Sequence, residues 1–201
     1  MATDINVARR KFDHEVEQFH RMGAICRERG IWLIYADFPR VIVAFATPKS
    51  PNVFVPFAAD IDFSDYDAQP LGVVLVHPVT FKRLKLSEIL PQFSMGMAGR
   101  MMRLRTTANH QVIPDNIVQA FDESRPFLCI AGVKDYHDNP AHTGDSWWLH
   151  RRNGEGTLSH IVNIIWAYGV KNIIAPQMNL QVQFAGFSLQ SEVEQPLAAT
   201  S

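Results

Sequence analysis

The sequence has few cysteines and no long apolar run, and each scarcity excludes a class of protein. Its 201 residues include two cysteines, Cys26 and Cys129, and in a reducing compartment two such residues are better interpreted as separate thiols than as a disulfide. No uninterrupted apolar segment approaches the roughly 20 residues of a membrane-spanning helix, and the first residues lack the apolar core of a signal peptide. We therefore expect a cytoplasmic protein with no membrane partner.

Net charge is also scarce. The chain has 19 lysines and arginines against 20 aspartates and glutamates, for a formal net charge of -1. Proteins that bind nucleic acid usually present a clustered basic surface, so no nucleic-acid partner is expected. With 47% hydrophobic residues the chain can bury one sizeable core. We predict one domain over residues 1–201, with an irregular insertion at about 80–125 and a frayed tail after about 187.

The pattern of apolar residues predicts an α+β fold. An amphipathic helix is expected from about Asp4 to Arg29, ended by Gly30. Runs rich in β-branched and aromatic residues then predict an antiparallel meander. Its four strands are expected at Ile31 to Tyr35, Arg40 to Phe45, Val53 to Ile61 and Leu71 to Val76. A C-terminal helix should follow Thr157, a favourable N-cap residue, and end at Gly169.

Residues 80–125 carry weaker signals. Short helices are expected from Leu86 to Phe93 and from Ile113 to Phe121, where Pro114 suits a first helical turn. Between them lie four methionines interleaved with arginines and loosened by two glycines: Met95, Met97, Met101 and Met102. Methionine adapts to irregular surfaces, so docking of a partner protein is one hypothesis for this segment, and packing in a core is the other.

The most informative segment runs from Phe127 to Arg151, where one cysteine, three histidines, three aspartates and two adjacent tryptophans occur together. Cys129 follows an apolar, strand-like run, and His137 and His142 come 8 and 13 residues later. A thiol near imidazoles is either an activated nucleophile or a ligand of a soft divalent metal. The sequence alone leaves both interpretations open.

In the first interpretation Cys129 is a catalytic nucleophile. An imidazole titrates near neutral pH, so His137 or His142 would accept the proton of the thiol or of an incoming nucleophile. Asp135 would orient one of the imidazoles. This interpretation gives each of these residues a role without a metal ion.

In the second interpretation Cys129, Asp135, His137 and His142 bind zinc. All four are ligand types that zinc accepts, and Pro140 excludes a regular helix across the segment. Their spacing is wider than that of common zinc knuckles, and a closed four-ligand site would quench the thiolate. Such a protein would be a non-catalytic binding module, or would keep an open metal position for hydrolysis.

A plainer interpretation makes several of these residues packing residues. The two tryptophans would be a core and a rim residue if the segment is extended, and His150 would lie at the surface or pack there. Cys26 is expected to be a small buried hydrophobe. A scaffold that kept the fold and lost catalysis is a further possibility.

The order of the expected elements, with several short motifs, resembles the ubiquitin-conjugating fold. The matching pieces are the helix, the four-stranded meander, a Phe-x-x-Tyr-x-x-x-Pro loop at 63–70, His77-Pro78, Leu128-Cys129-Ile130, a tryptophan at 147 or 148, and the C-terminal helix. The pattern Cys129-x5-Asp135-x-His137-x4-His142 also looks like the signature of a bacterial family of predicted metal-binding proteins. That family is named for its Cys-Glu-His-His pattern and is associated with ubiquitin-like modification operons.

The resemblance implies that Cys129 accepts a ubiquitin-like protein from an activating enzyme as a thioester and passes it to a target amine. Asp135 stands where the family has glutamate. Ubiquitin-conjugating enzymes carry a His-Pro-Asn triplet shortly before the cysteine, whereas His77-Pro78-Val79 lies 52 residues before it here. His137, His142 or Asn139 would then stabilise the developing oxyanion. The alternative is a zinc-binding accessory protein of the same pathway; the sequence indicates no oligomeric state.

Overall fold

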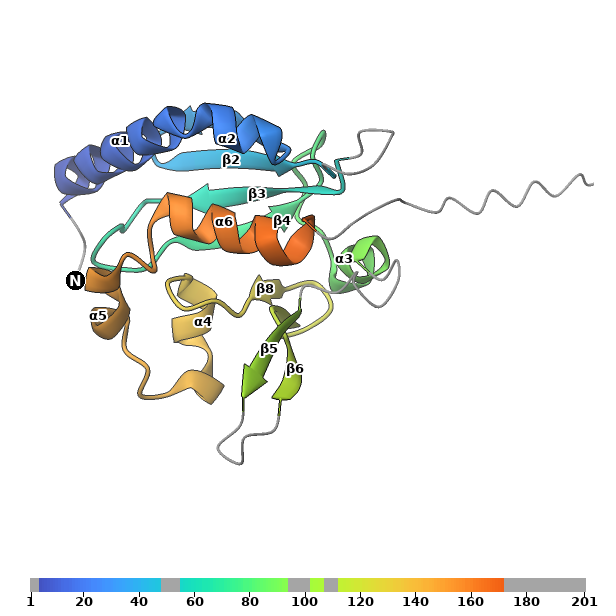
Figure 1. The fold of residues 1–201 in the computed structure, drawn as a ribbon. Coiled ribbons are helices and arrows are strands. Elements are labelled where there is room, and N and C mark those ends of the chain that lie inside the picture. The colour runs from blue at the N-terminus through green and yellow to red at the C-terminus, as the bar shows by residue number, and fades with distance from the viewer. Residues whose placement is uncertain (1–3, 48–54, 94–101, 107–111, 172–201) are drawn as a thin grey trace, which may run out of the picture.

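A four-stranded antiparallel sheet forms the centre of the protein, seen in a computed structural model that describes residues 4–47, 55–93, 102–106 and 112–171 (Figure 1). Its strands pair in chain order and are β1 Ile31–Asp37, β2 Arg40–Phe45, β3 Phe57–Asp62 and β4 Gly72–Val76. The predicted meander is therefore confirmed. Val53, where the sequence predicts the start of the third strand, lies outside the described residues.

Three helices cover one face of this sheet (Figure 1): α1 Ile5–Arg21, α2 Gly23–Glu28 and α6 Leu158–Gly169. The face is apolar because side chains alternate along a strand, and Val41, Val43 and Phe45 of β2 all point into the core with no exposure. The structure is thus α+β, with the predicted N-terminal and C-terminal helices. Thr157 caps α6 as expected, since its side chain accepts the His160 N–H.

The single helix expected from Asp4 to Arg29 is two helices. The first ends at Arg21 and the second begins at Gly23, with Met22 between them. A glycine in a helix interior costs up to about 1 kcal/mol relative to alanine, which favours an interruption there. Gly30, with φ +74°, follows the second helix as predicted.

Residues 80–125 contain regular structure, and one prediction there is wrong. The helix α3 Leu86–Phe93 is confirmed. The helix expected from Ile113 to Phe121 is instead two strands, β6 Val112–Asn116 and β7 Val118–Ala120, which pair with β5 Met102–Thr106 and β8 Pro126–Leu128. Four β-branched residues between positions 112 and 118 favour strands, and partners for both strands are present.

Some expectations lie outside the described residues. These are the Met-rich segment at positions 95, 97 and 101 and the tail after about 187; Met102 opens β5. In the described part of the chain, every helix is too short or too polar to cross a membrane.

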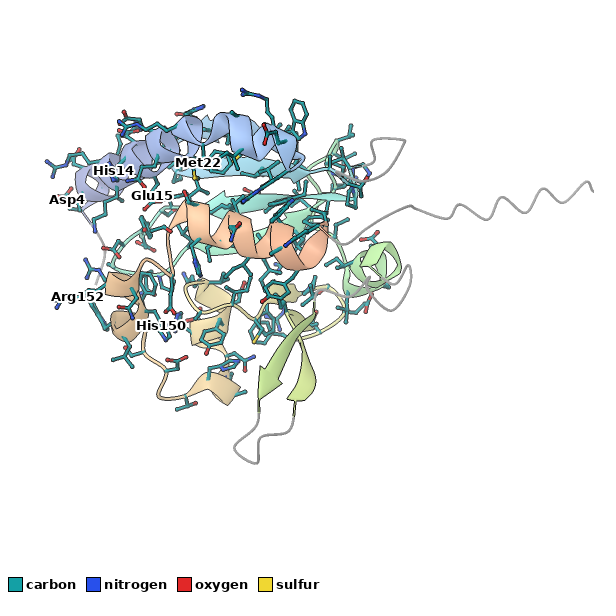
Figure 2. All side chains as sticks on the ribbon, in the orientation of Figure 1. Asp4, His14, Glu15, Met22, His150 and Arg152 are labelled. Atoms are coloured by element: carbon teal, nitrogen blue, oxygen red, sulfur yellow. The ribbon has the colours of Figure 1, made fainter. Side chains whose placement is uncertain are left out.

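A buried carboxylate joins α1 to α6. Glu15 is 6% exposed and points from α1 toward the start of α6 (Figure 2). It accepts hydrogen bonds from the Leu158 N–H at 3.0 Å and from the Tyr66 hydroxyl at 3.3 Å. Burial raises the pKa of Glu15 above its usual value, although both hydrogen bonds oppose the shift.

A second carboxylate, that of Asp67, anchors the segment after α5 Trp147–His150. Asp67 is 9% exposed and pairs with Lys11 of α1 and with Arg151. Its carbonyl oxygen also accepts the Trp147 indole N–H at 3.1 Å. The loop after β3 therefore fixes two distant parts of the chain.

We predict that Glu15→Ala lowers the free energy of unfolding by about 1–3 kcal/mol, since the buried Leu158 N–H and Tyr66 hydroxyl lose their acceptor. Glu15→Gln keeps an acceptor and removes the charge. The pKa of Glu15 is higher in the folded state than in the unfolded state. The contribution of Glu15 to the free energy of unfolding of the wild type therefore decreases as pH rises above 4.5. Denaturant titrations at a series of pH values should show that the free energy of unfolding of Glu15→Gln increases relative to that of the wild type over that range. A constant difference would contradict this account.

Candidate functional site

Strand alternation determines which way Cys129 points. Leu128 and Ile130 lie in the main core at 1% and 3% exposure, so Phe127 and Cys129 face the opposite side. The Cys129 backbone N–H donates to the Ile117 carbonyl at 2.6 Å, which extends the pairing of the β8 strand by one residue. The thiol lies in a smaller cluster with Tyr136 of α4 Lys134–Asp138 and is 2% exposed.

His142 places its imidazole beside the thiol. It ends the short helix η1 Pro140–His142, whose first turn is capped because the Asn139 side chain accepts the Ala141 N–H. Its Nε2 lies 3.3 Å from the Cys129 Sγ. The sequence prediction that one of the two histidines lies beside Cys129 therefore corresponds to His142, brought back over the cysteine by the proline-containing turn.

His137, the other candidate imidazole, has both ring nitrogens engaged with the backbone. It lies on α4 Lys134–Asp138, and its Nε2 accepts the Gly132 N–H at 3.2 Å. Because Nε2 is an acceptor in that bond, Nδ1 carries the proton and donates to the Asp145 carbonyl at 2.9 Å. His137 thus links the turn after Cys129 to the turn after His142. Neither nitrogen has a lone pair left for a metal ion in this arrangement.

Gly132 allows the chain to turn at this point. Its φ is +92°, and a Cβ built there would lie 2.4 Å from the Glu155 carbonyl oxygen. Any other residue would be strained and would collide with backbone. The close approach of residues 132 and 155 holds the cysteine turn against the end of the site segment.

Asp135 faces away from the cysteine. It lines a polar groove of about 470 Å³ with Arg83, Lys134 and the Arg40–Asp60 ion pair. Burial raises the pKa of Asp135, and Arg83 is the nearby charge that most opposes the rise. Successive helical residues project about 100° apart, so Asp135 points to the groove while its neighbour Tyr136 packs beside Cys129. The structure does not bring Asp135 together with either imidazole.

The four residues proposed as zinc ligands are consequently not assembled. Among the residues that the structure describes, no three histidine, cysteine, aspartate or glutamate side chains are arranged to hold a metal ion. Cys129 and His142 are adjacent, His137 is committed to backbone groups, and Asp135 lies in the groove. This donor set does not fit a four-ligand zinc site.

Three residues that the sequence analysis did not assign to the site extend it. Asp145 accepts the Tyr136 hydroxyl at 2.5 Å and contacts His150 Nε2 through its other oxygen. His150, the last residue of α5 and labelled in Figure 2, contacts Glu155 through Nδ1. A carboxylate five residues to either side of His150 is the sequence signal that indicates this arrangement.

The remaining motif residues have structural roles. Trp147 is 6% exposed and Trp148 is 62% exposed, the expected core and rim residues. His77 is exposed, and its Nδ1 accepts the N–H groups of Val79 and Thr80 in the turn after β4. Cys26 is buried in α2, where burial raises the pKa of its thiol.

Comparison with known proteins identifies the family. The model of the Y4jH-like family, described as the Y4jH family, matches residues 3–173. The chain belongs to the Y4jH-like family. The y4jH protein of Sinorhizobium fredii (strain NBRC 101917 / NGR234) is 37% identical over 190 residues, covering 91% of this chain and 92% of the relative. The family match contains the whole Cys129 to Glu155 segment, and neither name states a reaction, so a functional proposal depends on the geometry of this member.

We predict that this Y4jH-like protein, purified without chelator, carries far less than one zinc per chain, because the four proposed ligands are not gathered. Elemental analysis by mass spectrometry measures the metal content, and a chelator should leave the thermal midpoint unchanged. About one zinc per chain, lost together in Cys129→Ala, His137→Ala and His142→Ala, would instead establish the metal site.

Proposed function

We propose that this chain is a cysteine-dependent acyl-transfer enzyme of a bacterial ubiquitin-like conjugation pathway, with Cys129 as acceptor and His142 as base. The observation that supports the proposal is the 3.3 Å separation of Cys129 Sγ and His142 Nε2. A thiol nucleophile needs a base within hydrogen-bond reach, and this pair meets that requirement. His137 braces the two turns of the site in this proposal.

The first step is a thioester exchange. His142 Nε2 takes the proton of Cys129, and the sulfur attacks the carbonyl carbon of the modifier's C-terminus, which arrives as a thioester on the activating enzyme. A new carbon–sulfur bond forms to Cys129, and the bond to the donor sulfur breaks. The donor thiolate leaves with the proton from His142. The exchange needs no oxidant or reductant.

The second step passes the acyl group to a target amine. The amine nitrogen attacks the same carbonyl carbon, and the carbon–sulfur bond to Cys129 breaks. His142 takes the proton that the amine loses and returns it to the Cys129 sulfur. The products are an amide and the free thiol, so the enzyme is ready for another cycle.

The arrangement of the fold supports the ubiquitin-like part of the proposal. A helix, a four-stranded meander, a cysteine in an extended segment and a final helix follow one another in the order that the ubiquitin-conjugating fold has. The Phe63 to Pro70 loop is also consistent with that fold, since Phe63 and Tyr66 pack edge to face in the core. The His77-Pro78-Val79 triplet has no asparagine, and His77 bonds within the turn after β4. The oxyanion role that asparagine has in ubiquitin-conjugating enzymes would therefore fall to another group of the site.

Access to the thiol requires movement. Cys129 is 2% exposed, and an acyl group cannot reach its sulfur until the covering segment shifts. The turn at 140–144 is the exposed part of the segment that covers the thiol. Its Gly144 has φ +96°, and a Cβ added there would contact no atom within 4 Å, so this end of the turn is loosely packed. Docking of the donor protein would supply the energy that opens the Gly144 end of this turn while His142 stays beside the sulfur.

We predict that the protein, incubated with its activating enzyme, ATP and ubiquitin-like modifier, forms an adduct that thiols release. Cys129→Ala should abolish the adduct, and Cys26→Ala is the matched control that should retain it. His142→Gln should lower the rate of adduct formation by roughly 100-fold or more, as loss of a general base does. Non-reducing gels and intact-protein mass spectrometry measure the adduct. An adduct on Cys26, or none with a partner set shown to be active, would refute the proposal.

A further inference from the structure

Among the described residues, no hydrogen-bond partner orients His142 as the base of a catalytic pair is commonly oriented. In such sites a third group usually accepts a hydrogen bond from the second nitrogen of the imidazole. Within the part of the chain that the structure describes, no hydrogen bond to His142 Nδ1 is present. A half-buried imidazole held only by its contact with a thiol would sample several rotamers. Something else must keep Nε2 directed at Cys129.

An aromatic ring fills that role. The His142 imidazole stacks on the Tyr136 phenol, with ring centroids 4.0 Å apart and planes 26° from parallel. Tyr136 is 9% exposed and packs in the same cluster as Cys129. The phenol therefore touches both members of the pair and forms a flat support that restricts rotation of the imidazole.

The position of the phenol is itself fixed. Its hydroxyl donates to Asp145 Oδ2 at 2.5 Å, and the Asp145 backbone N–H donates to the His142 carbonyl at 3.0 Å. One residue thus holds both the support and the turn that carries the imidazole. The His137 Nδ1–H donates a hydrogen bond to the Asp145 carbonyl, which is a third contact that holds Asp145.

Asp145 is held in turn by His150. Asp145 and Glu155 each contact one nitrogen of His150, and two carboxylates are satisfied only when both nitrogens carry protons. Burial opposes that charge, but the hydrogen bonds to Asp145 and Glu155 prevail and raise the pKa of His150. The hydroxyl of Tyr136 and His150 lower the pKa of Asp145, which stays an acceptor. The chain of contacts runs from Glu155 to Tyr136 without a break.

We propose that Tyr136 is the positioning residue of the site: its ring, anchored through Asp145 and His150, keeps the His142 imidazole aligned with the Cys129 thiol. This inference rests on the proposed function, in which that pair performs the chemistry. Tyr136 acts through His142, and its hydroxyl is committed to Asp145. The arrangement replaces the usual hydrogen-bonded third member with a stacked ring.

The experiment measures formation of the Cys129 thiolate. In a Cys26→Ala background, the ultraviolet absorbance of the thiolate is followed against pH, with a Cys129→Ser protein as the blank. Tyr136→Leu removes the ring, and Tyr136→Phe keeps the ring but removes its anchor. Tyr168→Leu is the matched control, because Tyr168 is 38% exposed on α6 and outside the site. Circular dichroism verifies that each variant is folded.

We expect the midpoint of thiolate formation to rise by about one pH unit in Tyr136→Leu, since an aligned imidazolium stabilises the thiolate by roughly that much. The rise should be smaller in Tyr136→Phe and absent in Tyr168→Leu. Loss of packing alone would lower the thermal midpoint and, by admitting water to the thiol, would lower the titration midpoint and not raise it. If Tyr136→Leu does not fold, Asp145→Ala, which removes the acceptor of the Tyr136 hydroxyl, carries the test and should raise the midpoint as Tyr136→Phe does.

An unchanged midpoint in folded Tyr136→Leu would overturn the inference. If His142→Gln also leaves the midpoint unchanged, the pair itself is wrong, and the proposed function fails with the inference. If the midpoint responds to Tyr136 but no modifier adduct forms with an active partner set, the positioning role stands and the proposed acyl transfer fails. The two assays therefore separate the two claims.

Discussion

The structure depends on two buried carboxylates that cannot be left unpaired. Burying an ionised carboxyl group in the interior costs several kcal/mol unless hydrogen bonds or cations satisfy it. Glu15 finds its partners on the loop after β3 and at the start of α6, and Asp67 finds its partners on α1 and after α5. The elements that carry these groups therefore have one relative arrangement in which both acids are satisfied.

The same loop determines where the site lies. At one end of the site segment, the Lys134 N–H donates to the Leu71 carbonyl at 2.8 Å. At the other end, Trp147 and Arg151 bind Asp67. Residues 134–151 thus leave from and return to residues 67–71, and the intervening turns place His142 over Cys129. A site on an irregular segment gains the rigidity of the sheet in this way.

Much of the fold was predictable because its signals are local. A run rich in β-branched residues specifies β2, and Thr157 with the apolar face after it specifies α6. The strands at 112–120 were not predicted, because Pro114 suits both a first helical turn and an edge strand, and the choice depends on distant partners. The break at Met22 was not predicted either. Gly23 disfavours a continuous helix locally, but whether the helix is interrupted also depends on how the two helical segments pack.

The candidate site was predictable in its cysteine and in one histidine. Cys129 and His142 are adjacent as a dense cluster of such residues suggests, but side-chain direction on a five-residue helix separates Asp135 from them and turns Tyr136 toward them. Side-chain direction on a helix depends on the residue at which the helix begins. No side-chain cap marks the start of α4, so the spacing of residues in the sequence does not predict that direction. Asp145, His150 and Glu155 were overlooked because each looks like an ordinary polar loop residue, and only the close approach at Gly132 brings their segment against the cysteine turn.

The burial of the Cys129 thiol has a consequence for its chemical stability. Peroxide and other cellular oxidants attack thiolates that they can reach, and they convert them first to sulfenic acid and then to irreversible products. Cys129 is 2% exposed and Cys26 is 7% exposed, so a resting molecule offers almost no sulfur to such reagents. Under the proposed acyl-transfer function, Cys129 would face oxidative damage only while a docked donor protein uncovers it.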